Sequence, residues 1–445
     1  MKKFLSFFLL FLVFIGYSQE SLTYQKPSEE ILNLVDAPLA PSVLITDDGK
    51  HMVMLYRDAY KTIEELSEDE LRLAGLRINP KTNIGSRTNY YNNIKIKPTS
   101  AQQEIQVNGL PENPRLANFS WSPDQSKIAV TNTTKTGVEV WVLDLEKASV
   151  KKLTEANVNA NLGDVINWFK DGNSILVKML PTARKALINA SEAVPAGPTI
   201  SSNDGKKAQN RTYQDLLKNP NDEFNFEQLA LSELHKVDLN GNTTLWKGAE
   251  MYRSLSFSPD GSYIMAVTID RPFSYLVPYY RFPSTTTIYK NDGSVVQQIL
   301  KVPLIEDLPQ GFMAERTGMR DFSWRSDKPS TLIYAQVLDG GDPENEAAFR
   351  DEVFQLEAPF KGEGKSILKT INRFGGIQWG NDGLAIAYDR WWNTRNTKSY
   401  VFNPSDPSEK PKILSDRNYQ DVYNDPGEFV TARNEYGLNV LALDS

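Results

Sequence analysis

The sequence contains no cysteine and only two histidines. A chain without cysteine forms neither disulfide bonds nor thiolate metal sites. His51 and His235 each begin a segment that we expect to be a strand, which favours surface or packing roles over acid–base or metal chemistry. The motif Gly-x-Ser-x-Gly, which places a nucleophilic serine on a strand-to-helix turn, is also missing. The sequence therefore predicts no catalytic residue, no metal and no cofactor within this chain.

Long basic segments are absent as well. The chain carries 49 Lys and Arg residues against 56 Asp and Glu residues, which gives a formal net charge of −7. No stripe of alternating basic and aromatic residues interrupts this mildly acidic composition. The charge pattern therefore argues against a nucleic acid as the partner.

Only one long apolar run occurs, and it lies at the N-terminus. Phe4–Ile15 follows two lysines and precedes the small residues Gly16 and Ser18. This is the pattern of a secretory signal peptide over residues 1–18. A membrane anchor is the alternative, but the run is shorter than the ~20 residues that a span needs. We expect an exported bacterial protein, periplasmic or secreted, with no membrane attachment after cleavage.

A strand–turn–strand unit, here called a kernel, recurs along the chain. In Leu255–Val267 an apolar run leads into Ser258-Pro259-Asp260-Gly261, and a second apolar run follows. This pattern predicts two antiparallel strands joined by a tight turn. Five other kernels are centred on Ile45, Trp121, Trp168, Trp324 and Trp379.

The number of kernels decides the predicted fold. After the kernel at Trp121, the segments 138–145 and 150–154 predict two further strands, so that one unit holds four strands. Six such units are too many for a simple sandwich, and each apolar face needs a neighbouring unit to cover it. We predict an all-β fold, a β-propeller of about seven blades over residues 19–445, whose last blade begins near Phe429 and is incomplete. A pair of β-sandwiches is the alternative.

Two segments interrupt the regular spacing of the kernels. Thr62–Leu76 has acidic residues followed by leucines, which predicts one short helix. From about residue 181 to 234 the strand pattern is broken by Pro195–Pro198, Ser201–Gly205 and a helix-like stretch at Tyr213–Lys218. We interpret this second segment as an insertion in the third blade rather than a separate core.

Two motifs resemble ligand sites but favour plain turns. Gly364-Lys365-Ser366 matches the end of a phosphate-binding loop, yet Pro359 stands where the first glycine is needed. Asp339–Glu344 offers carboxylates for calcium without the alternating ligand spacing of calcium loops. Neither motif predicts a bound ion or nucleotide.

Two arginine-rich segments are the candidate binding sites. Glu315–Asp321 contains Arg316 and Arg320, and Tyr388–Arg395 combines Arg390 with paired tryptophans. A guanidinium can hold a carboxylate through two parallel hydrogen bonds, so these residues are candidates for substrate binding. Salt bridges between blades, with the tryptophans in the core, are the alternative interpretation.

Several segments of the sequence closely resemble the prolyl oligopeptidase clan of serine peptidases, and specifically its glutamyl endopeptidase-like branch. The resemblance covers almost the whole of residues 19–445. It is carried by Leu71–Ile78, Thr212–Leu217, Arg316–Gly318, Phe322–Pro329, Leu338–Pro343, Arg350–Phe354, Arg373–Gly380 and Arg390–Arg395.

The resemblance implies a function that needs a second domain, which this chain does not contain. Members of the clan join a β-propeller to a C-terminal α/β-hydrolase domain that carries the catalytic serine, aspartate and histidine. By this resemblance the chain is the substrate-gating and docking propeller, the hydrolase domain is absent from it, and a peptide cleaved after glutamate is the substrate. The chain is then either a piece of a longer product or a naturally truncated relative. A free-standing propeller that binds a peptide or protein is the alternative function.

Overall fold

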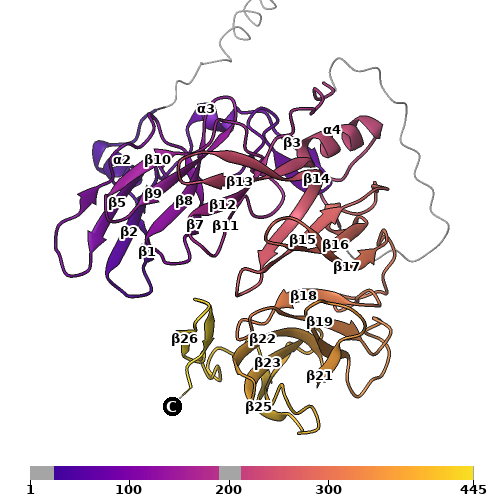
Figure 1. The fold of residues 1–445 in the computed structure, drawn as a ribbon. Helices are drawn as coiled ribbons and strands as arrows, with labels where there is room; N and C mark the ends of the chain where they lie inside the picture. Colours follow the sequence, from indigo (N-terminus) through magenta and orange to yellow (C-terminus); the bar gives the residue numbers. More distant parts are fainter. Residues whose placement is uncertain (1–24, 190–211, 444–445) are drawn as a thin grey trace, which may run out of the picture.

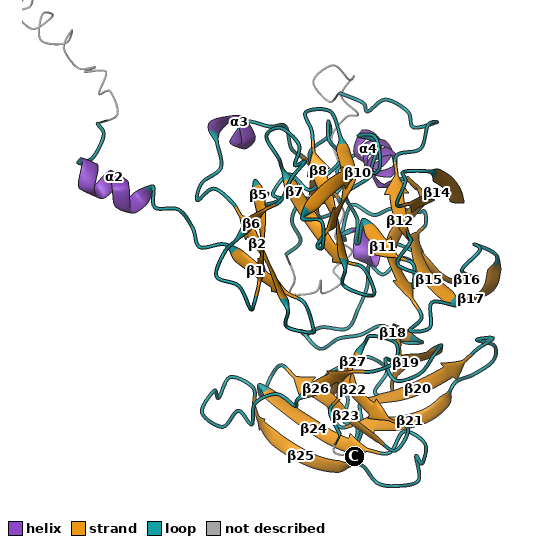
Figure 2. Cartoon of the chain, turned by 60° about the vertical axis from the view of Figure 1, so that its left-hand side comes forward, coloured by secondary structure: helices purple, strands orange, loops and turns teal. Residues whose placement is uncertain are grey.

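The computed structural model describes residues 25–189 and 212–443. The predicted signal peptide and the middle of the predicted insertion lie outside these residues. Within them the chain is built mainly from antiparallel strands, and helices are few and short (Figures 1 and 2). None of the helices in the described part is long and apolar enough to cross a membrane.

The strands form the blades of a β-propeller, and all six predicted kernels are confirmed. Each blade consists of four strands in an antiparallel ladder, with the kernel as its first two strands. Blade 1 contains β1 (Ser42–Ile45), β2 (His51–Tyr56), β5 (Asn93–Pro98) and β6 (Ile105–Gln106). Blade 2 contains β7 (Leu116–Trp121), β8 (Lys127–Thr133), β9 (Val138–Asp144) and β10 (Ser149–Lys152).

Blades 3 and 4 form one continuous seven-stranded sheet. Its first strands are β11 (Ile166–Trp168), β12 (Ser174–Met179) and β13 (Ser232–Asp238). The next strand, β14 (Thr243–Phe257), pairs with β13 through its first half and with β15 through its second half. One strand therefore closes blade 3 and opens blade 4, which continues with β15 (Tyr263–Ile269), β16 (Ser284–Lys290) and β17 (Val295–Val302).

The chain ends with two more blades and a short hairpin. Blade 5 contains β18 (Arg320–Trp324), β19 (Thr331–Val337), β20 (Asp351–Glu357) and β21 (Lys365–Thr370). Blade 6 contains β22 (Arg373–Asn381), β23 (Leu384–Trp391), β24 (Asn396–Phe402) and β25 (Lys412–Asn418). The hairpin of β26 (Thr431–Arg433) and β27 (Asn439–Leu441) is the beginning of the incomplete seventh blade that the sequence predicts. Among the described residues, no ladder of hydrogen bonds joins blade 6 to blade 1.

The kernel turns of blades 1, 2 and 4 share one hydrogen-bond network. In blade 4, the hydroxyl of Ser258 donates to the Asp260 carboxylate over 2.6 Å and accepts from the backbone N–H of Tyr263 over 2.9 Å. The same carboxylate accepts from the backbone N–H of Ser262 at 3.0 Å. The network recurs in the pairs Thr46/Asp48 and Ser122/Asp124. Short polar side chains thus fix the turn, as expected for such residues.

The prediction of a helix over Thr62–Leu76 is wrong for most of this segment. Only α3 (Ile63–Leu66) is helical, and the leucines beyond it form a hairpin of β3 (Leu71–Leu73) and β4 (Leu76–Ile78). The turn of this hairpin is Ala74-Gly75, and both residues have positive φ, at 53° and 87°. Two residues with positive φ form the tight turn that suits an antiparallel pair, whereas a right-handed helix cannot contain them.

The predicted insertion contains a helix, but it does not lie at Tyr213–Lys218. It is α4 (Pro220–Ala230), whose N-cap Asn219 accepts a hydrogen bond from the Asp222 backbone N–H at 2.9 Å. Proline at the first helical position removes an N–H group that would have no partner, which explains why the helix begins there. Phe226 and Leu229 of α4 are fully buried against the β3–β4 hairpin and blade 4. A second short helix, α2 (Glu29–Val35), contributes no buried residue and was not predicted.

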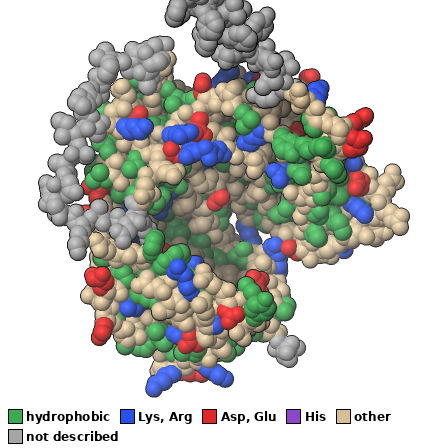
Figure 3. Space-filling view, turned by 180° about the vertical axis from the view of Figure 1, so that it is seen from behind, with side chains coloured by type: hydrophobic (Ala, Val, Ile, Leu, Met, Phe, Trp, Pro, Cys, Tyr) green, Lys and Arg blue, Asp and Glu red, His purple; other side chains and the backbone are tan. Residues whose placement is uncertain are grey.

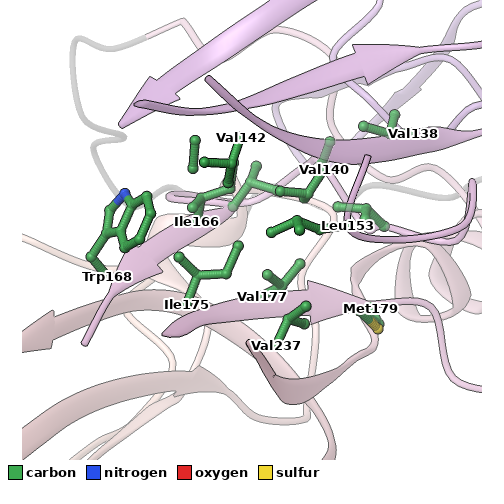
Figure 4. Packing of buried hydrophobic residues seen from close by; sticks show 14 of the residues in the cluster. Val138, Val140, Val142, Leu153, Ile166, Trp168, Ile175, Val177, Met179 and Val237 are labelled. Carbon is green, nitrogen blue, oxygen red and sulfur yellow. The ribbon is translucent and has the colours of Figure 1, made fainter. Parts of the chain in front are cut away.

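The hydrophobic core lies between neighbouring blades. Figure 4 shows the cluster between blades 2 and 3, where valines of β9 face the apolar side chains of β11 and β12. Similar clusters lie between blades 1 and 2, 3 and 4, 4 and 5, and 5 and 6. Burial of each aliphatic side chain contributes about 1.5–3 kcal/mol. This packing holds the blades around a centre that appears as a deep hollow in the space-filling view (Figure 3).

The β26–β27 hairpin contacts several kernel turns at once. Arg433 forms an ion pair of 2.5 Å with Asp47 of blade 1, and the Lys170 ammonium of blade 3 donates to the backbone carbonyl of Tyr436. The Asn434 side chain donates to the backbone carbonyl of Ser326 in blade 5 at 2.7 Å. The hairpin therefore bridges turns that are far apart in the sequence.

Candidate functional site

The predicted site arginines lie at the edge of the blades that is opposite the kernel turns. Arg320 is the first residue of β18, and Arg316 precedes that strand. Arg390 lies near the end of β23, where it pairs with Arg373 at the start of β22. In an antiparallel pair the start of one strand and the end of the next meet at the same edge. All three residues consequently face the same end of the propeller.

Arg320 belongs to a buried ion network. Its guanidinium contacts the carboxylates of Asp351 and Asp321. Arg373 lies 3.2 Å from Asp351 and 2.8 Å from Asp339, which also contacts Arg350 at 2.7 Å. Removing one partner from such a network leaves an uncompensated buried charge. For Arg320 the structure therefore supports an ion-pair role: its own pair with Asp351 lies within blade 5, and the network reaches blade 6 through Arg373.

The same network includes Asp339, the first residue of the predicted turn at Asp339–Glu344. Burial alone would raise the pKa of Asp339, but hydrogen bonds from Arg373 and Arg350 outweigh it and lower that pKa. The carboxylate thus stays ionised and is held by arginines. No group of three or more His, Cys, Asp or Glu side chains suited to a metal ion is found in the described ranges.

Arg390 is exposed and stacks on aromatic rings. Its guanidinium carbon lies 4.4 Å from the ring centre of Tyr419 and 5.9 Å from that of Trp392. The neighbouring Trp391 is covered by Arg350 at 3.9 Å. The paired tryptophans are therefore partly exposed partners of arginines rather than core residues, and stacking of this kind contributes about 0.5–1 kcal/mol at an exposed site.

Arg316 differs from Arg320 because no carboxylate contacts it among the described residues, and it differs from Arg390 because it is half-buried and not exposed. Its guanidinium donates to two backbone carbonyls, those of Thr317 at 3.0 Å and of Met319. The side chain is half-buried, and burial lowers the pKa of Arg316. Of the three predicted arginines, Arg316 is thus the half-buried one that has no carboxylate partner in the described structure, whereas Arg390 lies exposed on its aromatic partners.

Sequence reasoning missed Arg253, the equivalent of Arg320 in blade 4. Arg253 stands the same distance before Phe257 as Arg320 stands before Trp324, so alignment of the kernels would have found it. The charge of Arg253 is close enough to lower the pKa of Arg316, although burial is the larger cause. Arg253 in β14 and Arg320 in β18 thus hold equivalent positions in the first strands of adjacent blades, while Arg390 stacks on its own aromatic partners.

A large cavity lies elsewhere in the described structure. It has a volume of about 1340 Å³ and opens between the segment around α3 and the strands of blade 2. Two ion pairs lie in its lining, Arg115 with Glu68 at 2.9 Å and Lys152 with Glu139 at 2.9 Å. Basic and acidic residues line the cavity in similar numbers, so its lining does not favour a ligand of one charge.

Comparison with known proteins identifies relatives over nearly the whole chain. No family model matches the sequence. A probable chloroplastic glutamyl endopeptidase of Arabidopsis thaliana is 34% identical over 434 residues, which cover 94% of this chain and 45% of the relative. Its counterpart from Oryza sativa subsp. japonica is 33% identical over 442 residues, covering 96% and 47% respectively.

The chain belongs to the glutamyl endopeptidase branch of the prolyl oligopeptidase family. It spans about half the length of the curated relatives that it matches. Among solved structures, the acylaminoacyl peptidase of Pyrococcus horikoshii has a TM-score of 0.41 at 14% identity and covers 86% of this chain and 47% of its own. The β-propeller domain of the trilobed protease from Pyrococcus furiosus has a TM-score of 0.35 at 12% identity, covering 87% and 85%.

Proposed function

We propose that this chain is the substrate-gating and docking propeller of an exported serine endopeptidase that cleaves peptides after glutamate. The observation that carries the proposal is the unpaired Arg316 at the edge of the propeller, in a chain whose relatives are named probable glutamyl endopeptidases. The basic start and apolar run of residues 1–18 support export.

The chemistry of such an enzyme divides between two parts. Acyl transfer from the peptide to a serine and then to water needs a catalytic triad, which a C-terminal α/β-hydrolase domain would supply. The propeller would limit access to that domain and contribute to the pocket for the residue before the cleaved bond. Arg316 would bind the glutamate carboxylate, Arg320 would hold the neighbouring strands through its ion network, and Arg390 would lie at the rim.

A guanidinium can discriminate strongly between glutamate and glutamine. A site built around a half-buried positive charge leaves that charge uncompensated when the ligand is neutral. A hydrogen bond to a charged group contributes about 1.5–3 kcal/mol, which corresponds to a factor of about 10 to 150 in binding. Selectivity of this size is enough to define a cleavage preference.

The test uses the longer product that contains both domains. We expect it to cleave a peptide after glutamate, and we expect Arg316→Gln to lower kcat/KM for this peptide by about tenfold or more, with a much smaller effect on a glutamine peptide. Arg417→Gln is the matched control, because Arg417 pairs with Asp425 at the surface of blade 6. Equal losses for the two peptides, or no loss, would contradict the assignment of Arg316.

The chain of residues 19–445 should itself hydrolyse no peptide and should not react with an active-site serine probe. The sequence lacks the Gly-x-Ser-x-Gly elbow that would carry a nucleophilic serine. Labelling of this chain by the probe would overturn that expectation. Tight binding of peptides by a longer product that cleaves none would instead favour the binding-module interpretation.

A further inference from the structure

The cavity of about 1340 Å³ beside α3 lies at the edge of the propeller that is opposite the kernel turns. Its walls are the connection between β2 and β5 of blade 1, the segment before β7, and the strand ends of blade 2 near Thr133 and Glu139. Arg316 lies at the same edge but precedes the first strand of blade 5. Small-molecule sites have volumes of about 300–1,000 Å³, so this cavity, here called the α3 cavity, suits a larger ligand.

The walls of the α3 cavity are held in place by two networks. Glu68 of the connection accepts hydrogen bonds from Arg115 at 2.9 Å and from Asn79 at 2.7 Å, which fixes the connection to the segment before β7. On blade 2, Glu139 is 8% exposed and pairs with Lys152 at 2.9 Å. Side chains that are ordered before a ligand arrives lose less conformational freedom when it binds.

Free charges of both signs line the same cavity. The charged lining side chains that form no ion pair and no side-chain hydrogen bond in the described structure include the basic Arg57, Lys81 and Lys135 and the acidic Asp58, Asp69 and Glu112. A ligand with charges of one sign is repelled by one of these two sets, and an uncharged ligand removes water from both without replacing it. A polypeptide segment that carries acidic and basic side chains can pair with both sets.

Thr82 provides an independent indication of a polar ligand. It lines the cavity and is 3% exposed, and its hydroxyl has no hydrogen-bond partner among the described residues. Buried hydroxyls normally have a partner, and leaving one without a partner costs free energy. The N–H and C=O groups of a peptide backbone are a donor and an acceptor that can supply this partner.

Apolar side chains extend the lining on its outer side. Tyr60 lines the cavity and is largely exposed. Ile63 and Leu66 of α3 are also largely exposed, and residues three apart lie on the same side of a helix. A group of exposed apolar residues marks an interaction surface. Apolar residues beside free charges of both signs match the mixed side chains of a polypeptide better than the hydroxyl groups of a carbohydrate.

We propose that the α3 cavity is an exosite, a docking site that binds an extended segment of the polypeptide substrate away from the bond that is cleaved. The segment carries acidic and basic side chains together with apolar ones, and its backbone bonds to the hydroxyl of Thr82. The exosite deepens the proposed function and rests on it, because the substrate of an endopeptidase is the polypeptide that occupies the cavity. It favours long substrates over short ones.

Binding of three labelled peptides to the purified chain of residues 19–445 tests the chemistry of the site. The peptides have blocked ends and contain no glutamate. In the first, lysines and aspartates alternate between leucines; in the second, asparagine replaces every aspartate; in the third, glutamine replaces every lysine. Fluorescence anisotropy should show that the first binds about tenfold or more tightly than either of the others.

Three variants test whether the cavity holds this peptide. Lys135→Gln and Asp69→Asn change exposed side chains and should each weaken its binding by about tenfold or more, whereas Thr82→Val, which removes only the hydroxyl, should weaken it about two- to tenfold without lowering the melting temperature. Lys147→Gln is the matched control, because Lys147 lies at the kernel-turn edge of blade 2, where it pairs with Asp144 at 3.2 Å.

The longer product gives a second measurement. The same three variants should raise KM for cleavage of a long polypeptide that contains the mixed-charge segment, and they should leave kcat and the cleavage of a short glutamate peptide unchanged. A purely structural role of these residues would change both substrates alike. An equal rise of KM for the long and the short substrate therefore contradicts the exosite.

Failure of the exosite and failure of the proposed function can be distinguished. The exosite is overturned if the mixed-charge peptide binds no more tightly than the other two, or if Arg316→Gln abolishes its binding while the cavity variants do not. It is also overturned if the peptide binds residues 19–445 but not the longer product, because another segment of that product then fills the cavity. If binding depends on the cavity but the longer product does not cleave after glutamate, the polypeptide site stands and the proposed function fails.

Discussion

At the scale of single residues, the partners of each arginine decide its role. Arg316 and Arg320 stand in the same short segment and look alike in the sequence. They differ because Asp351, which contacts Arg320, comes from the next but one strand of the blade. Sequence reasoning could identify the segment as a candidate site but could not assign different roles to its two arginines. The difference depends on contacts between strands that are distant in the chain.

Lys178 gives a prediction at the same scale. Burial lowers the pKa of Lys178 from 10.5 to about 7. Because its pKa in the unfolded chain is higher, the unfolded state binds more protons between about pH 7 and pH 10.5, and the contribution of Lys178 to stability therefore rises with pH across this range.

The comparison that isolates this effect is with Lys178→Met, measured by urea unfolding at pH 7, 8 and 9. We expect the stability of the original chain relative to the variant to increase with pH, by up to about 1.4 kcal/mol for each pH unit. Parallel pH profiles for the two proteins would show that the buried lysine does not change its protonation in this range.

At the scale of elements, short polar turns define the kernels, and this is why the sequence predicts them well. The network of Ser258 and Asp260 forms within a few residues, so its signal is local and readable. The hairpin of β3 and β4 is harder to predict from the sequence, because its acidic and leucine-rich residues are also compatible with a helix. What decides against the helix is the positive φ of Ala74 and Gly75, together with burial of Leu73 against α4.

Ser258→Ala tests the importance of the turn network. Ser258 is 3% exposed, and its hydroxyl makes two hydrogen bonds within the turn. Leaving the Tyr263 N–H without its acceptor should lower the free energy of unfolding by about 1–3 kcal/mol, as measured by urea unfolding. Ser262→Ala, which removes one exposed hydrogen bond to Asp260, is the control and should cost less. Equal effects of the two changes would argue against a structural role for the buried hydroxyl.

At the scale of the whole molecule, the β26–β27 hairpin links blades that do not otherwise pair. It contacts the kernel turns of blades 1, 3 and 5 and packs beside β22 of blade 6. Val440 and Leu441 are buried at 9% and 6% exposure. The sequence predicts that a further unit begins here, but contacts across the ring depend on the arrangement of all blades and have no local signal.

Removal of residues 429–445 should therefore lower the melting temperature of the chain by several degrees, because burial of each large apolar side chain contributes about 1.5–3 kcal/mol. Arg433→Gln alone should change it little, since an exposed ion pair contributes about 0–1 kcal/mol. Differential scanning calorimetry of the three proteins provides the measurement. An unchanged melting temperature after removal of the hairpin would show that it does not hold the blades together.

The continuous strand β14 has a mechanical consequence. Its first half belongs to blade 3 and its second half to blade 4, with Arg253 at the bulge in the second half. A pulling force applied to either of these two blades is transmitted to the other along a single extended strand that is hydrogen-bonded in both blades. Neighbouring blades elsewhere in the ring are joined by loops, which bend more easily, and by side-chain packing. Blades 3 and 4 should thus move as one rigid plate, and any widening of the ring to admit a peptide would have to occur at another joint.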